Sequence, residues 1–217
     1  MSADTAMVEA FNNQGYYVLR NVISPDLAHA LYNCAVELQS RVVGRSIVVG
    51  SLHVADEWDA QNLGWDGQTL EHPTLQAFVR HPDFIRPMSL MAGGELDAEP
   101  ADWAIHQTDP GDAGVLWHQD LAPVEMGATI AISVMMMETP ATEPNYHVIP
   151  GSQDRPAPTE QQMVEMQPGE QVVAQSNRDV LVHSPLLWHS SIQNASARPH
   201  RRLLMYFKAR VQDKTVA

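Results

Sequence analysis

The stretch Leu116–Val124, LWHQDLAPV, places a histidine and a carboxylate two positions apart, at His118 and Asp120. Side chains at i and i+2 of a β-strand project from the same face, so both reach one metal ion if Val115–Asp120 is a strand. Two histidines and one carboxylate on a single face form the ligand set of non-haem Fe(II) oxygenases, which leaves the opposite face of the metal open. The alternative for so short a motif is a structural pair of a histidine and an acid.

A third ligand is expected from a distant strand. The segment DVLVHSPLLWHSSIQNAS contains His183 and His189. His189 follows an apolar run and precedes small polar residues, as a ligand at a strand end does. Pro185 interrupts the segment between the two histidines, so they are not expected to share one unbroken strand. His189 is therefore the preferred third ligand.

Two kinds of pattern must position these side chains. Helical signals dominate the first hundred residues: a helix over Asp4–Gln14, one beginning at Ser24-Pro25-Asp26, and one or two within HPTLQAFVRHPDFIRPMSLM. Tyr16–Leu19 is expected to be a short strand. From Asp102 onward, short β-like runs alternate with turn residues; the expected strands are Trp103–Thr108, Val115–Asp120, Thr129–Met137, His147–Ile149, Gln171–Ala174, Val180–His183, Leu187–Ile192 and Arg202–Arg210.

This order predicts a mainly β fold with helical support. About eight closely spaced strands indicate a jelly roll, the double-stranded β-helix of cupin-like proteins, flanked by N-terminal helices. We expect a single domain over 1–217, with 1–100 as helical support and 101–211 as the jelly-roll core. Residues 44–72 have mixed signals and are interpreted as a lid or pocket wall.

Composition narrows the functional class. The 217 residues carry a formal net charge of -13, with a pI near 5.0, which argues against nucleic acid and anionic membranes as partners. Cys34 is the single cysteine, so no disulfide within one chain and no cysteine-rich zinc site is expected. The sequence shows no signal peptide and no membrane-length apolar run. A cytoplasmic protein with a small-molecule substrate is the expectation, and the oligomeric state stays open.

Four segments, in this order, resemble the phytanoyl-CoA dioxygenase family of Fe(II)/2-oxoglutarate oxygenases. They are FNNQGYYVLRNVISPDLAHAL, WHQDLAP, YHVIPGSQDR and DVLVHSPLLWHSSIQNASARPHRRLLMYF. One departure is Gln153, which stands where the family usually has histidine. The resemblance implies that His118, Asp120 and His189 are the metal ligands and the catalytic centre, with Fe(II), 2-oxoglutarate and O2 as cofactor and co-substrates. Asp120 is present where related halogenases have a small residue, so oxygenation is favoured over halogenation.

The resemblance also implies a site for 2-oxoglutarate. The family places an arginine a little over ten residues beyond the second histidine, and a guanidinium holds both oxygens of a buried carboxylate. Arg201 is preferred, Arg202 is second, and Arg198 is a further candidate; the alternative is a solvated basic pair at a strand end. Other expected co-substrate contacts are Ser191, Thr108 and Gln107.

The predicted function is an Fe(II)/2-oxoglutarate-dependent dioxygenase that oxidises a C–H bond of a small metabolite, with release of succinate and CO2. Hydroxylation is favoured, with desaturation or ring formation open. The acid-rich 54–66 stretch, with Trp58 and Trp65, suits a cationic substrate. The alternatives are an inactive metal- or ligand-binding protein on the same fold, and a cupin-like metalloenzyme that does not use 2-oxoglutarate.

Overall fold

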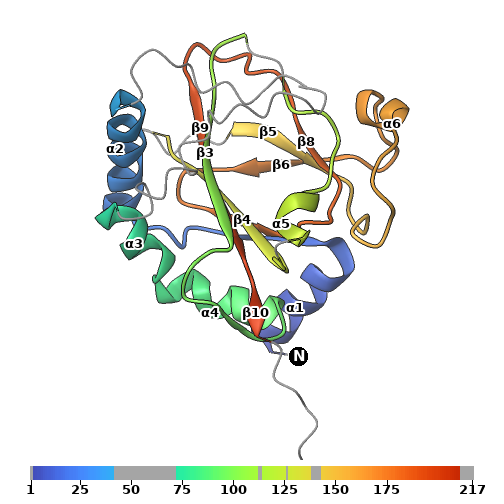
Figure 1. Cartoon of the computed structure of the whole chain (residues 1–217), viewed down its shortest axis with the longest axis horizontal. Coiled ribbons are helices and arrows are strands. Elements are labelled where there is room, and N and C mark those ends of the chain that lie inside the picture. The colour runs from blue at the N-terminus through green and yellow to red at the C-terminus, as the bar shows by residue number, and fades with distance from the viewer. Residues whose placement is uncertain (1, 42–71, 112–113, 126, 138–142, 211–217) are drawn as a thin grey trace, which may run out of the picture.

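The protein is described by a computed structural model that covers residues 2–41, 72–111, 114–125, 127–137 and 143–210. Its strands form antiparallel sheets, and Figure 1 shows helices along one side of them. The major sheet has the order β1-β7-β4-β9-β3, and the minor sheet has the order β6-β5-β8. The strands of the major sheet are β1 (Tyr16–Leu19), β3 (Asp102–Thr108), β4 (Ile130–Met135), β7 (Val180–His183) and β9 (His200–Phe207).

The remaining elements complete the two layers and their connections. The minor sheet is built from β5 (Glu143–Val148), β6 (Gln171–Gln175) and β8 (His189–Ser191). A further strand pair joins β2 (Glu95–Leu96) to β10 (Ala209–Arg210). The helices are α1 (Ala3–Gln14), α2 (Pro25–Arg41), α3 (Pro73–Val79), α4 (Pro82–Met91), α5 (Leu121–Glu125) and α6 (Glu160–Val164).

The N-terminal helices begin and end where the sequence provides caps. Ser2 caps α1 through its side chain, and Gly15 ends that helix with a φ of 78°. The segment from 72 to 91 forms two helices, each with a proline in its first turn and a histidine as N-cap, His72 for α3 and His81 for α4. The prediction of one or two helices in this segment is therefore confirmed, and there are two.

The major sheet has two chemically different faces. One face packs its aliphatic and aromatic side chains against α1 to α4 in the largest hydrophobic core; the β9 members of this core are Leu203, Met205 and Phe207. The register places the alternate residues of β9, which include Arg202 and Leu204, on the opposite face. We call this opposite face the inner face, because it meets the minor sheet: Tyr146 and Val148 of β5 pack with Leu181 of β7.

The expected mainly β architecture, with helices first and strands after, is confirmed. One predicted element is wrong, because Val115–Asp120 does not form a strand. The segment runs as an irregular connection with one isolated bridge, between His118 and His189, and then turns into α5. The pocket wall expected at 44–72 lies almost entirely outside the described residues.

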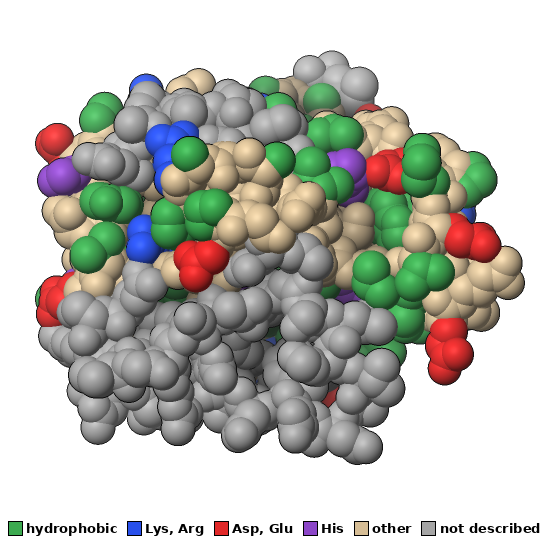
Figure 2. Space-filling view, turned by 90° about the horizontal axis from the view of Figure 1, so that it is seen from above, with side chains coloured by type: hydrophobic (Ala, Val, Ile, Leu, Met, Phe, Trp, Pro, Cys, Tyr) green, Lys and Arg blue, Asp and Glu red, His purple; other side chains and the backbone are tan. Residues whose placement is uncertain are grey.

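On the face seen in Figure 2, acidic side chains are scattered among apolar and polar ones. Within the described part of the chain, no helix is both long and apolar enough to cross a membrane.

Candidate metal centre

His118, Asp120 and His189 come together at the edge of the minor sheet. His118 and His189 form a hydrogen-bonded backbone pair: His118 N–H donates to His189 O at 3.0 Å, and His189 N–H donates to His118 O at 3.1 Å. Directly opposed residues of an antiparallel pair project from the same side, and the two ring centroids are 4.1 Å apart. The backbone N–H of Asp120 donates to Pro185 O at 2.8 Å, which fixes the carboxylate beside them.

The three side chains direct their donor atoms toward one point. Asp120 Oδ1 lies 3.5 Å from Nε2 of both histidines, and the three possible ligand atoms are all within 4.8 Å of one another. Each Nδ1 is occupied by a carbonyl in its own segment, Leu116 O at 2.8 Å for His118 and Leu187 O at 2.9 Å for His189. Such bonds fix the tautomer that leaves Nε2 as the ligand atom.

A divalent cation fits this cluster. Asp120 Oδ2 is buried without a hydrogen-bond partner among the described residues, and a buried carboxylate oxygen of this kind is costly unless a cation or donor reaches it. His118 is about one-third exposed at 33%, whereas Asp120 and His189 are at 10% and 6%, so the cluster is open on the His118 side.

The charges of the three groups depend on one another. Burial alone raises the pKa of Asp120, but His189 and His118 outweigh it and hold that pKa well below its ordinary value. Burial likewise lowers the pKa of His118, yet the hydrogen bond and charge of Asp120 reverse the effect and raise it. Asp120 is therefore an anion near neutral pH, as a metal ligand must be.

Aromatic groups of the inner face support His189. The ring of Tyr146 stacks on the His189 imidazole, with centroids 5.3 Å apart and planes 13° from parallel, and His183 lies on another side at 5.1 Å. The hydroxyl of Tyr146 lies 3.4 Å from His183 Nε2. His183 is thus not a ligand of the cluster but a buried neighbour of one, and burial lowers its pKa to about 4.

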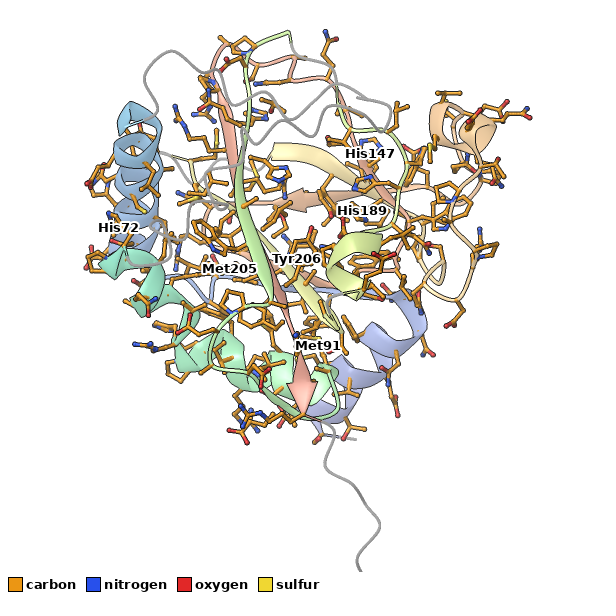
Figure 3. All side chains as sticks on the ribbon, viewed as in Figure 1. His72, Met91, His147, His189, Met205 and Tyr206 are labelled. Carbon is orange, nitrogen blue, oxygen red and sulfur yellow. The ribbon has the colours of Figure 1, made fainter. Side chains whose placement is uncertain are left out.

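His147 is close to His189 in the view of Figure 3 but has a different role. It pairs in register with Ser190, one residue from His189, so its ring belongs to the face opposite to that of Tyr146. There its Nδ1 contacts the carboxyl group of Glu170. Because side chains alternate between the two faces of a strand, His147 and the ligand His189 lie on opposite faces of the minor sheet.

The candidate arginines lie on opposite faces of β9. Arg201 shares the face of Leu203 and Met205, toward the helices, and its Nε donates to Gln107 Oε1 at 2.8 Å. Arg202 lies on the inner face, where its guanidinium donates to Ser133 Oγ at 2.5 Å and Gln175 Oε1 at 2.9 Å. Which of the two arginines contacts the co-substrate stays a prediction, and the inner-face position of Arg202 is the observation that bears on it.

Arg202 lies beside the aromatic ring that supports His189. Its guanidinium carbon lies 4.9 Å from the centre of the Tyr146 ring, the same ring that stacks on His189. Burial lowers the pKa of Arg202 to about 10, so the group remains a cation in a weakly solvated place. Ser133 and Gln175, the hydrogen-bond partners named above, are neutral side chains that orient the guanidinium.

The other expected co-substrate residues divide in the same way. Thr108 lies on the inner face, where its partner across the strand pair is His200. Gln107 lies on the helix-covered face with its partner Arg201. Ser191 is two residues beyond His189 on the same face, and its Oγ accepts a hydrogen bond from Val115 N–H at 2.9 Å. Residues that the sequence reasoning missed on the inner face are Tyr146, Gln175 and His106; period-two spacing within each strand could have grouped them only once the inner face was known.

The chain belongs to the phytanoyl-CoA dioxygenase family, whose model matches residues 11–203. A comparison with curated proteins finds no match. The predicted family is thus confirmed over most of the chain.

Solved structures show the same fold. AviO1 from Streptomyces viridochromogenes Tue57 is 21% identical, with a TM-score of 0.72, over 100% of this chain and 98% of that one. EctD from S. alaskensis, solved with 2-oxoglutarate and 5-hydroxyectoine, is 17% identical, with a TM-score of 0.70, over 96% of this chain and 76% of that one. The epimerase SnoN, solved with Fe3+, alpha ketoglutarate and nogalamycin RO, is 17% identical, with a TM-score of 0.70, over 95% and 84%.

These likenesses confirm the predicted jelly-roll fold. Together with the His-Asp-His cluster, the family supports an iron- and 2-oxoglutarate-dependent oxidoreductase of the dioxygenase type.

Proposed function

We propose that this protein is an Fe(II)- and 2-oxoglutarate-dependent oxygenase that hydroxylates a C–H bond of a small metabolite. The observation that carries the proposal is the pairing of two sites on one inner surface: a three-residue cluster that fits a divalent cation, and Arg202, a desolvated cation that suits a carboxylate. Tyr146 contacts both sites, since its ring stacks on His189 and lies beside Arg202.

In this proposal His118, Asp120 and His189 hold the iron through two Nε2 atoms and a carboxylate oxygen. When bound, iron and 2-oxoglutarate supply an oxidant derived from O2, and the co-substrate leaves as succinate and CO2. Asp120 occupies a ligand position with the protein's own carboxylate, which favours oxygen transfer over halide transfer.

The protein's own groups select and orient the co-substrate. Arg202 is the anchor for the distal carboxylate, since a guanidinium binds both oxygens at once and Ser133 and Gln175 hold it in place. Ser191 and Thr108 add hydroxyl groups to the same surface. Trp117 and Trp188 are buried apolar side chains that neighbour the two histidine ligands in the sequence. In this proposal they help to exclude water from the cluster.

The neighbouring arginines offer a matched test. The purified protein is given Fe(II), 2-oxoglutarate, O2 and ascorbate, and succinate is measured by NMR. Binding of 2-oxoglutarate to the anaerobic Fe(II) protein is followed by calorimetry and by the visible charge-transfer band of the complex. We expect Arg202→Met to weaken 2-oxoglutarate binding by about 100-fold or more, the size of a lost charged hydrogen-bond pair. Arg201→Met, one residue away on the other face, is the control and should stay within about 3-fold.

The rival functions predict other results. An inactive binding protein gives no succinate with a panel of small metabolites, amine-bearing ones included, although metal still binds. A metalloenzyme that ignores 2-oxoglutarate shows no binding of the 2-oxo acid, and Arg202→Met then changes nothing. Equal losses in both arginine variants would also contradict the anchor assigned to Arg202.

The substrate class follows only in broad terms. SnoN is solved with nogalamycin RO and EctD with 5-hydroxyectoine, both of them small molecules. We extend that class, small metabolites, to this chain. The residues predicted to suit a cation, Trp58 and Trp65, lie outside the described part of the chain.

A further inference from the structure

His106 occupies a place on the inner face that the proposed function has not used. It lies on β3 and pairs directly in register with Arg202 on β9. Directly opposed residues of antiparallel strands have Cβ atoms about 4.5–5.5 Å apart and project from the same face. The imidazole of His106 therefore stands beside the guanidinium.

The same imidazole is within electrostatic range of the metal cluster. Asp120 and His118 both act on its charge, as does Arg202. His106 thus lies near groups of both sites, the cluster at one end and the arginine at the other. The ring is therefore placed to contact a 2-oxo acid that binds at both sites.

His106 differs from the other buried or partly buried histidines of the strands in its hydrogen bonding. His183 contacts Tyr146 and Ser184, His147 contacts Glu170, and His200 contacts Ser196. No hydrogen bond joins the His106 ring to another residue in the ranges that the structure describes. Its ring nitrogens are also not among the fully buried polar atoms that lack a partner, so they are available to a molecule bound beside Arg202.

The protonation state suits a donor of one hydrogen bond. Burial lowers the pKa of His106 to about 4, with Asp120 opposing this and His118 and Arg202 adding to it. The ring is neutral near pH 7, and a neutral imidazole carries one N–H and one acceptor nitrogen. It can therefore donate to a carboxylate without adding a second charge next to Arg202.

We propose that His106 contacts the bound 2-oxo acid and donates a hydrogen bond to one of its carboxylate oxygens. The inference rests on the proposed function and adds a residue that positions the co-substrate. A hydrogen bond to an ionised acceptor is stronger than a neutral one, so its loss is expected to weaken binding by about 10- to 100-fold.

The test uses the whole chain with Mn(II) or Fe(II), without O2, so that binding is measured apart from turnover. His106→Leu removes the donor at similar volume, and His106→Gln restores an N–H donor. We expect His106→Leu to raise the Kd of 2-oxoglutarate by about 10- to 100-fold and to shift the visible band of the Fe(II) complex, with the metal Kd unchanged within about 3-fold. His106→Gln should recover at least part of the affinity.

A second ligand locates the contact. 2-Oxobutyrate has the keto acid end of 2-oxoglutarate but no distal carboxylate. A loss limited to 2-oxoglutarate assigns the bond to the distal carboxylate, and a loss with both acids assigns it to the carboxylate next to the keto group. Either result supports the proposal.

Two results would overturn it. In the first, His106→Leu binds both acids as the wild type does, while Arg202→Met has lost 2-oxoglutarate; the proposed function then stands and the role of His106 falls. In the second, metal affinity falls in step with that of the acid, which makes His106 a support of the metal cluster. If Arg202→Met also leaves binding of 2-oxoglutarate intact, the proposed function itself has failed.

Discussion

Asp120 is the residue on which the cluster converges. One of its oxygens lies 3.5 Å from both ligand nitrogens, and the other is buried with no hydrogen-bond partner among the described residues. The two histidines stabilise the anion, but a metal ion satisfies it more fully, because it can contact an oxygen that no donor reaches. Metal binding therefore depends most on the negative charge of Asp120.

Asp120→Asn tests that dependence. The amide has the same shape but carries no charge, so we expect affinity for Mn(II) or Fe(II) to fall by about 100-fold or more. In thermal or urea unfolding, metal at about 100 times the wild-type Kd stabilises the wild type by about 2.7 kcal/mol. The variant should gain almost none of this. An equal gain in both proteins would place the metal elsewhere.

Residue identities were easier to predict from sequence than the faces they occupy. His118, Asp120 and His189 are distinctive in type and spacing, and they do come together. Arg201 and Arg202 differ by one position, and a strand turns that difference into opposite faces. The spacing of Leu203, Met205 and Phe207 correctly groups Arg201 with them. Only the packing of helices on that face shows that it is the helix-covered face and not the inner face.

At the scale of elements, the connection from Gly114 to Asp120 shows how an irregular segment holds two ligands. The sequence predicts a strand there, because His-x-Asp alternation and apolar neighbours satisfy the period-two rule. The chain instead touches β8 at few points: Ser191 N–H donates to Val115 O, and His118 pairs with His189. The two ligands still lie together. A single bridge to His189 aligns His118, and the turn into α5 places Asp120 beside both histidines.

Gly114 sets how closely this connection approaches β8. A Cβ built at Gly114 lies 1.7 Å from Ser191 O, a backbone atom that cannot rotate away. We expect Gly114→Ala to push the connection off β8, destabilise the fold by about 1–3 kcal/mol and weaken metal binding by about 10-fold, because His118 and Asp120 move with it. Urea unfolding and a metal titration measure the two effects.

Gly169→Ala is the control for that experiment. Gly169 has a φ of 84° with open space around it, so an alanine there strains only the backbone. It should cost about 1 kcal/mol in stability and leave metal affinity unchanged. Metal affinity that survives in Gly114→Ala would show that the cluster does not depend on the close approach.

At the scale of the whole molecule, the order of motifs carried more information than any one of them. Four segments between Phe11 and Phe207 resemble one family, and they include the start of α2, the metal motif and β9. That order anticipates the layers seen in Figure 1. The contacts among Tyr146, His183 and Arg202 could not be anticipated, because they join strands of different sheets through pairings that no local pattern encodes.

The layered interior also sets how stability depends on pH. His106 and His183 are neutral in the fold because burial lowers the pKa of each to about 4, whereas an unfolded histidine titrates near 6.5. As pH falls below about 6.5 the unfolded chain therefore takes up protons that the folded one does not, and stability is lost down to about pH 4. His118 acts in the opposite direction, because its pKa is raised in the fold. Its contribution to stability is complete below about pH 6.5 and is lost as the pH rises through the folded pKa. Through these three groups, the metal-free protein should thus be most stable between pH 6.5 and the raised folded pKa of His118.

His183→Phe isolates one of these contributions, because it keeps an aromatic ring in the buried position and removes the proton site. Between pH 6.5 and pH 4.5 a depressed histidine loses about 2–3 kcal/mol of stability, given 1.36 kcal/mol per pH unit in that interval. Urea unfolding with a chelator present should show that the wild type loses about that much more than His183→Phe over the same interval. Tyr146 loses its partner in the variant, which lowers stability equally at both pH values and cancels in the difference. Parallel curves for the two proteins would mean that His183 takes up its proton in the folded state as readily as in the unfolded chain.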